Sequence, residues 1–332
     1  MSRRGPSASG TVFAVLFFLA ATVVLTWPVA PRAGSGLADL WDAKLNAWIL
    51  HWDFHQTFRD PIHLYDANIF YPSRYALAFS ENLFGAALFG FPLYAAGAST
   101  LLAYNLVFLL GMLLSAMAAW ALARDVTGDP VASVAAGLVY AFCPWRIAQI
   151  PHIQFQWGAF LALALLFLLR YLDGGRRRDV VLFGVCFVWN ALCNVHYALF
   201  SGFLVAVVLA YEGLVSRTGA FRSRLGGVFG ALAVAGLLLG PFFTPYASAS
   251  KLYGMARGVE EIGAFSAVPT DFLTAGGQNK LYAPLTERWA KAEGELFPGL
   301  APVALAILAL AGRRRAEGRP EVLQASPGRR RL

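Results

Sequence analysis

Two carboxylates stand three residues apart in the stretch LADLWDAKLNAWILHW, residues 37–52, just after the first apolar run. On a helix, Asp39 and Asp42 would share a face near the N-terminus, where the helix dipole favours negative charge. A carboxylate held there can act as a general base or ligate a divalent cation. The alternative is a helix cap, and it is stronger for Asp39, because the pattern places Asp42 inside the first turn.

A third acid, Glu81, follows a segment rich in aromatic and hydrogen-bonding side chains, DPIHLYDANIFYPSRYALAFSENLFG at residues 60–85, which includes Asp66. Ring faces and polar groups of this kind suit a loop that binds a sugar or a lipid headgroup, and they suit a tightly packed loop equally well. If the segment folds back, Glu81 approaches Asp42. The two acids could then hold a divalent cation or divide the roles of acid and base.

Three basic side chains lie in short connections between apolar runs: Arg146 and His152 in CPWRIAQIPHIQFQW, and His196 in ALCNVHYALF. Ionisable groups this close to hydrocarbon are costly and usually line a cavity or meet a partner. The guanidinium of Arg146 matches phosphate oxygens in a forked geometry, so we expect it to bind phosphate. The two histidines could bind substrate or bond a carbonyl at a helix end.

The composition places these residues in a membrane protein. The chain has 332 residues, 58% of them hydrophobic and 14% charged, with a mean hydropathy of +0.56. The apolar fraction exceeds the roughly 45–50% of a soluble domain. The net charge is +8, but the basic residues collect in short loops and at the chain ends. That distribution indicates how the chain is oriented in a membrane and does not indicate a nucleic-acid partner.

Hydropathy predicts an all-α bundle of about eight spans. The Lys- and Arg-rich loops at 174–179, 216–224 and 312–319, together with the arginines at the N-terminus, should be cytoplasmic, which requires an even number of crossings. The run at 83–98 is short and contains three Gly and a Pro, so we expect it to stay on the outer surface. The apolar runs are 11–30, 83–98, 101–123, 130–145, 154–172, 180–195, 197–214, 225–246 and 298–312.

The expected organisation is a membrane domain over residues 1–312 with two outer segments, 31–100 and 247–297, and both termini in the cytoplasm. The first outer segment should contain a helix at about 39–57 that lies in the interface with its Trp residues at headgroup depth. In the second, acids such as Asp271 are expected to be solvated surface charges. The remaining residues, 313–332, read as a basic, disordered cytoplasmic tail.

Several stretches together resemble the GT-C class of bacterial membrane glycosyltransferases: LWDAKLNAWILHW, the segment at 60–85, SAVPTDFLTAGGQNKLY and ELFPGL. The resemblance covers the chain to about Gly312. It implies an essential acid in the first outer loop, acting as base or metal ligand, and a sugar that arrives on a polyprenyl phosphate. Asp42 matches that acid best and Asp39 second. Members commonly continue through more spans and a soluble domain, so this chain is expected to be shortened.

The expected protein is therefore a multi-pass inner-membrane glycosyltransferase that moves a sugar from a polyprenyl-phosphate donor to a glycan, lipid or protein acceptor on the periplasmic side. Asp42 would be catalytic, and no cofactor is expected other than a possible divalent cation held by Asp42 and Glu81. The alternatives are a transporter or flippase for lipid-linked intermediates and a non-catalytic membrane scaffold. The residues expected to bind substrate are Asp39, Asp66, Glu81, Arg146, His152 and His196.

Overall fold

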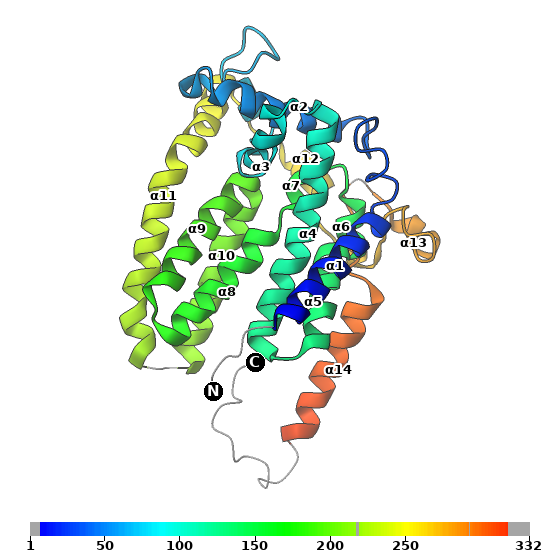
Figure 1. The fold of residues 1–332 in the computed structure, drawn as a ribbon, viewed down its shortest axis with the longest axis vertical. Coiled ribbons are helices and arrows are strands. Elements are labelled where there is room, and N and C mark those ends of the chain that lie inside the picture. The colour runs from blue at the N-terminus through cyan, green and yellow to red at the C-terminus, as the bar shows by residue number, and fades with distance from the viewer. Residues whose placement is uncertain (1–6, 217–218, 292, 318–332) are drawn as a thin grey trace.

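The computed structural model describes residues 7–216, 219–291 and 293–317, and it is all-α (Figure 1). The helices named below are α1 (Ala8–Leu25), α2 (Asp42–Thr57), α3 (Phe84–Ala95), α4 (Thr100–Thr127), α5 (Pro130–Phe142), α6 (Pro144–Ala148), α7 (Ile153–Gln156), α8 (Ala159–Gly174), α9 (Arg177–Cys193), α10 (Val195–Tyr211), α11 (Gly219–Tyr253), α12 (Val259–Phe265), α13 (Ala283–Thr286) and α14 (Leu300–Glu317).

Six helical stretches of the described chain are long and apolar enough to cross a membrane, so this is a multi-pass membrane protein. They are Ala8–Leu25, Thr100–Thr127, Pro130–Ala148, Ile153–Gly174, Val195–Val215 and Phe221–Tyr253. Each corresponds to a predicted span. The other two predicted spans form α9, which has 17 residues, and α14, whose apolar part is Leu300–Ala311.

Side-chain caps fix where several helices begin and thereby which residues reach the surface. Ser99 accepts a hydrogen bond from the Leu102 amide at the start of α4, and Asp129 accepts one from the Ala132 amide at the start of α5. Asn194 does the same for the Tyr197 amide at the start of α10. Such caps satisfy amides that have no partner within the helix.

The two ends of the bundle differ in content (Figure 1). The connections from α8 to α9 and from α10 to α11 lie at the lower end, and α14 runs toward that end. Helices α2 and α3 lie at the upper end. The basic loops therefore share one end, as predicted, and the first outer segment occupies the other. Residues 1–6 and 318–332 lie outside the described residues. The first part of the predicted disordered tail, residues 313–317, is helical and forms the end of α14.

The first outer segment is packed rather than loose. Helix α3 has 12 residues, about 18 Å at 1.5 Å per residue, and is too short to cross roughly 30 Å of hydrocarbon. It packs against α2, α4 and α9. Buried Leu50 of α2, Phe91 of α3 and Met112 of α4 belong to one apolar cluster. This apolar cluster packs α2 against the rest of the bundle.

Apolar side chains cover the outside of several spans. Leu16 of α1 is 60% exposed, Phe203 of α10 is 72% exposed and Leu237 of α11 is 78% exposed. Large apolar groups left unburied on long apolar helices are expected to contact lipid chains.

A close approach between α3 and α9 makes Gly85 sensitive to substitution. A Cβ atom at Gly85 would lie 2.7 Å from the Cys193 amide nitrogen, and the Gly85 carbonyl accepts a hydrogen bond from Trp189 Nε1 at 2.9 Å. We expect Gly85→Ala to destabilise the protein by about 1–3 kcal/mol, the usual cost of overpacking. Thermal unfolding in detergent measures this. In the control Gly236→Ala the added Cβ meets open space, so an equal melting temperature for both variants would contradict the prediction.

Candidate functional site

Asp42 lies beside a histidine at the upper end of the bundle. It is the first residue of α2, and its Oδ2 is 3.2 Å from Nε2 of His152, which precedes α7. The Asp42 side chain is 54% exposed and that of His152 is 23% exposed. One turn further along α2, Asn46 Nδ2 donates a hydrogen bond to the Pro151 carbonyl at 3.3 Å. This bond holds the His152 loop against α2, so the exposed acid has a fixed partner.

Asp39 forms a local turn. Its Oδ1 accepts a hydrogen bond from the Trp41 amide at 2.8 Å, the short-range bond that Asp commonly makes before a helix. Trp41 occupies the N-cap position of α2 and has no side-chain cap bond among the described residues, so Asp39 forms a turn without capping the helix, and its substrate role stays a prediction. Asp42 makes no such backbone contact among the described residues and keeps its carboxylate for other partners.

Glu81 pairs with the other predicted histidine. Its Oε1 lies 2.8 Å from Nδ1 of His196, in the first turn of α10. The Glu81 side chain is 15% exposed, whereas that of His196 is 65% exposed. The carboxylate is therefore mostly covered, and the imidazole extends from it toward the surface.

Asp42 and Glu81 therefore each pair with a different histidine and not with each other. Within the described ranges, no three His, Cys, Asp or Glu side chains gather in a way that could hold a metal ion. Divalent cations such as Ca²⁺ and Mg²⁺ take six or more oxygen ligands, and Mg²⁺ is often held by one or two carboxylates together with water and substrate phosphates. Among the described residues the structure does not bring Asp42 and Glu81 into one such group, and the divalent cation stays a prediction.

Phe155 connects the two acid–histidine pairs. Its ring makes an edge contact with His152 at a centroid distance of 5.7 Å and lies 6.1 Å from the ring of Tyr197, the residue after His196. The Tyr197 hydroxyl donates a hydrogen bond to the Phe155 carbonyl at 3.2 Å. Both pairs thus flank a single wall of aromatic side chains, which we call the Phe155 wall: Trp145, His152, Phe155 and Tyr197.

Arg146 is placed differently from the prediction. It is 3% exposed, its Nη1 donates to the Phe155 carbonyl at 2.7 Å, and its guanidinium carbon lies 4.9 Å from the centroid of the Tyr140 ring. The short helix α6 turns the side chain inward, where these groups replace water. Arg146 therefore stabilises the backbone of the Phe155 wall, and its buried guanidinium does not reach the surface, where a phosphate would bind.

Asp66 closes the loop of the first outer segment. Its Oδ1 accepts a hydrogen bond from the Tyr75 amide at 2.8 Å, and Phe70 and Tyr75 both adopt a positive φ of 56°. A left-handed backbone is unfavourable for aromatic residues, so the loop needs such a support. Asp66 therefore has a structural contact, while Phe70 and Tyr71 at the loop tip stay exposed and available for stacking.

Asp53 of α2 was not singled out in the sequence and is the most unusual acid in the described chain. It is 0% exposed, and neither carboxylate oxygen has a hydrogen-bond partner among the residues that the structure describes. Burial raises the pKa of Asp53 well above its usual range. The sequence does contain a signal for this burial. Asp53 lies at helical spacing from Ile49 and Leu50, which places it on the apolar face of the helix.

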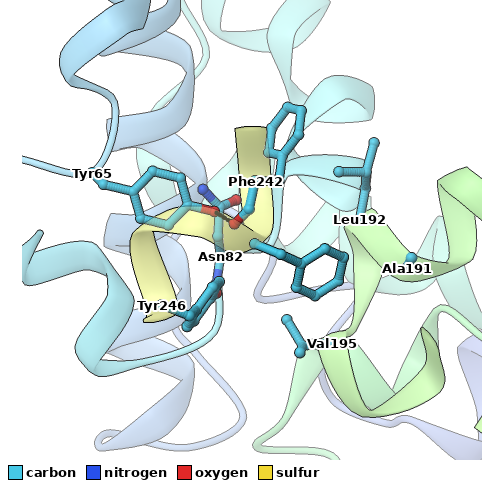
Figure 2. A pocket seen from close by; sticks show the side chains of 8 residues that line it. Tyr65, Asn82, Ala191, Leu192, Val195, Phe242 and Tyr246 are labelled. Atoms are coloured by element: carbon cyan, nitrogen blue, oxygen red, sulfur yellow. Dashed lines mark hydrogen bonds between the residues drawn. The ribbon is translucent and has the colours of Figure 1, made fainter. Parts of the chain in front are cut away.

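A small cavity of about 10 Å³, room for about one water molecule, lies near the Glu81–His196 pair. Asn82 and Val195, which line it, are the chain neighbours of Glu81 and His196. Tyr65 donates a hydrogen bond to the Phe242 carbonyl at 2.8 Å, and the Asn82 amide donates to the Tyr246 hydroxyl at 2.6 Å (Figure 2). The lining residues are Tyr65, Asn82, Ala191, Leu192, Val195, Phe242, Phe243 and Tyr246.

The second outer segment is also folded, and the interpretation of Asp271 as a solvated charge is wrong. Asp271 is 1% exposed. Its Oδ2 accepts a hydrogen bond from the Val268 amide at 2.9 Å and lies 3.0 Å from Lys291 Nζ. The acid joins two parts of the segment and is not available to a substrate.

No protein family, curated protein or solved structure matches the chain. The functional conclusion therefore depends on the geometry: two acid–histidine pairs along one aromatic wall, at the end of a multi-pass membrane fold opposite the basic loops.

Proposed function

We propose that the protein is a glycosyltransferase of the bacterial inner membrane that moves a sugar from a polyprenyl-phosphate donor to a glycan, lipid or protein acceptor on the periplasmic side. One observation carries the proposal: the exposed Asp42 carboxylate beside His152, at the end of the bundle opposite the arginine-rich loops. An acid in that position can take a proton from an acceptor hydroxyl at the lipid boundary.

The topology of the proposal has eight spans with both termini in the cytoplasm. Helix α8 ends, and α9 begins, at the lower end of the bundle, whereas α10 begins near the upper end. Helix α9 connects those ends and packs against α8, α10 and α11, so it crosses with them. Its 17 residues span about 26 Å. Helix α14 runs toward the lower end, and its full 18 residues, about 27 Å against 18 Å for α3, are assigned the eighth crossing in this proposal.

In the proposed reaction, the Asp42 carboxylate accepts the proton of the acceptor hydroxyl while the hydroxyl oxygen forms a bond to the anomeric carbon of the sugar. The bond from that carbon to the phosphate oxygen breaks, and its electron pair stays on the leaving phosphate. His152 holds the carboxylate in position through the 3.2 Å contact. The proton gained by Asp42 passes to water, since the side chain is half exposed.

An exposed aromatic ring beside the acid suits the sugar. Trp41, adjacent to Asp42 in the chain, is 84% exposed. Aromatic faces are apolar surfaces with defined geometry and are common in small-molecule sites. The lipid part of the donor would lie along the exposed apolar faces of α10 and α11.

Sugar transfer by the purified protein in lipid vesicles tests the proposal. We expect radiolabelled sugar to leave its polyprenyl phosphate when a panel of hexose and pentose donors is supplied with membrane acceptors. Failure to transfer with any donor would reject the enzyme, and movement of donor across the bilayer without transfer would favour the flippase alternative. In cells, a cysteine at position 42 should react with a membrane-impermeant thiol reagent from the periplasm. Reaction only from the cytoplasm would reject the topology.

A further inference from the structure

We propose that the lower end of the bundle binds the headgroups of anionic phospholipids through arginines at the starts of α9 and α11. The ligand chemistry is a negatively charged phosphodiester joined to acyl chains. The site lies at the end opposite the two acid–histidine pairs and goes beyond the proposed sugar transfer. We call this surface the arginine patch, and its members are Arg176, Arg177, Arg178 and Arg222.

Arg224 joins the two connections that carry the patch. From the second turn of α11, its Nη1 donates a hydrogen bond to the Leu172 carbonyl in the last turn of α8. A Cβ atom at Gly175 would lie 3.1 Å from Arg224 Nε, so this side chain also packs on the connection between α8 and α9. Leu172 of α8, Phe183 of α9 and Phe221 of α11 belong to one buried apolar cluster. The starts of α9 and α11 are therefore held side by side.

The charge of the patch faces water and is positive at any physiological pH. All four arginines are exposed, and none forms an ion pair with another described residue. The acids in the same connections are Asp173, Asp179 and Glu212, and Asp179 is only 8% exposed. A guanidinium does not lose its proton in a protein, so the patch presents a lasting attraction to anions.

Exposed apolar side chains continue from the patch along the same helix faces. On α9, Val181 and Val185 follow Arg177 by four and eight residues, so the three share one face. The two valines are 60% and 49% exposed. On α11, Phe229 follows Arg222 by seven residues and is 58% exposed. On both helices a lipid-facing stripe therefore ends in a cation.

This arrangement selects a lipid over a free anion and an anionic lipid over a zwitterionic one. A free phosphate would contact only the arginines and leave the apolar stripes unused. A guanidinium pairs with phosphate oxygens in a forked geometry. In a zwitterionic headgroup the ammonium group offsets the phosphate charge, so a cluster of arginines gains less from it. Each basic residue near an anionic membrane surface strengthens binding by about fivefold.

Binding of dioctanoyl phosphatidylglycerol to the purified full-length protein in a neutral detergent, measured by calorimetry, tests the site without turnover. The comparison ligands are dioctanoyl phosphatidylcholine, with the same chains, and glycerol 3-phosphate, with the phosphate alone. We expect the phosphatidylglycerol to bind at least tenfold more tightly than either. Arg177→Gln and Arg222→Gln should each weaken its binding by about fivefold and together by about 25-fold, and should leave phosphatidylcholine binding unchanged.

The matched control is Arg124→Gln. Arg124 lies in the last turn of α4, and the connection from α4 to α5 is also at the lower end (Figure 1). Its Nη1 donates to the Gly128 carbonyl at 2.5 Å. The substitution removes one positive charge from the same end but not from the patch, so binding should match the wild type. Equal weakening by Arg124→Gln and Arg177→Gln would show a general charge effect and overturn the site.

Two further results would overturn the proposal: equal affinity for phosphatidylglycerol and phosphatidylcholine, and binding of glycerol 3-phosphate as tightly as phosphatidylglycerol. If Arg177→Gln or Arg222→Gln does not fold, judged by its melting temperature, Arg176→Gln and Arg178→Gln test the same surface. Asp42→Asn should bind the lipid as the wild type does. Selective lipid binding without sugar transfer by the wild type would support this site and reject the proposed transferase.

Discussion

Asp42→Asn is expected to lower the rate of sugar transfer by roughly 10²- to 10⁴-fold, the usual contribution of a general base. Asn keeps the size and the hydrogen-bonding capacity of the side chain but cannot accept a proton from the acceptor hydroxyl. Because the Asp42 side chain is exposed and at a helix start, the variant should fold normally. The measurement is the initial rate of transfer from a labelled polyprenyl-phosphate sugar in vesicles.

Asp60→Asn is the matched control. Asp60 also pairs with a histidine in the first outer segment, His63 at 2.7 Å, but that pair is local and exposed. Its transfer rate should match that of the wild type. His152→Gln should lose less activity than Asp42→Asn, since His152 orients the acid and takes no proton from the acceptor. Transfer by Asp42→Asn at the rate of the wild type would show that the base lies elsewhere.

The second large effect concerns the buried acid of α2 and depends on pH. Asp53 has its pKa raised by burial, whereas the unfolded chain should have an ordinary Asp pKa near 3.9. Above that value the unfolded state has released its proton while the folded state still holds it, so the folded state binds more protons. The free energy of unfolding therefore falls as pH rises, by up to about 1.4 kcal/mol for each pH unit until the folded pKa is reached.

Asp53→Asn should remove this dependence. The amide has no charge to bury, so we expect the variant to melt at a higher temperature than the wild type at pH 8 and to differ from it less at pH 5. Melting temperatures in detergent between pH 5 and pH 8 measure the effect. Asp60→Asn, which replaces an exposed acid in the same segment, should give a curve parallel to that of the wild type. A parallel curve for Asp53→Asn would mean that Asp53 ionises in the folded protein without cost.

The features that were predicted well depend on local sequence. The helix expected at 39–57 is α2, Asp42–Thr57, because apolar residues recur at helical spacing from Ala43 onward. The short run at 83–98 forms α3, whose 12 residues cannot cross a bilayer. The basic loops meet at one end because alternate connections of a serpentine bundle must do so.

The features that sequence reasoning missed depend on packing between distant residues. His196 and Glu81 are 115 positions apart, and no pattern within either segment identifies the other as its partner. Arg146 reads as an outer loop residue, but the turn of α6 directs it inward. Asp53 lies on an apolar face, where an acid is normally too costly, and the sequence patterns did not single it out.

The Phe155 carbonyl oxygen accepts hydrogen bonds from Arg146 Nη1 and from the Tyr197 hydroxyl, that is, from α6 and α10 at once. One oxygen atom thereby ties the helix that precedes His152 to the helix that carries His196. The backbone segments that carry the two histidines are then coupled through a single acceptor atom. In the proposed transferase, a change that displaces this carbonyl would disturb both acid–histidine pairs together.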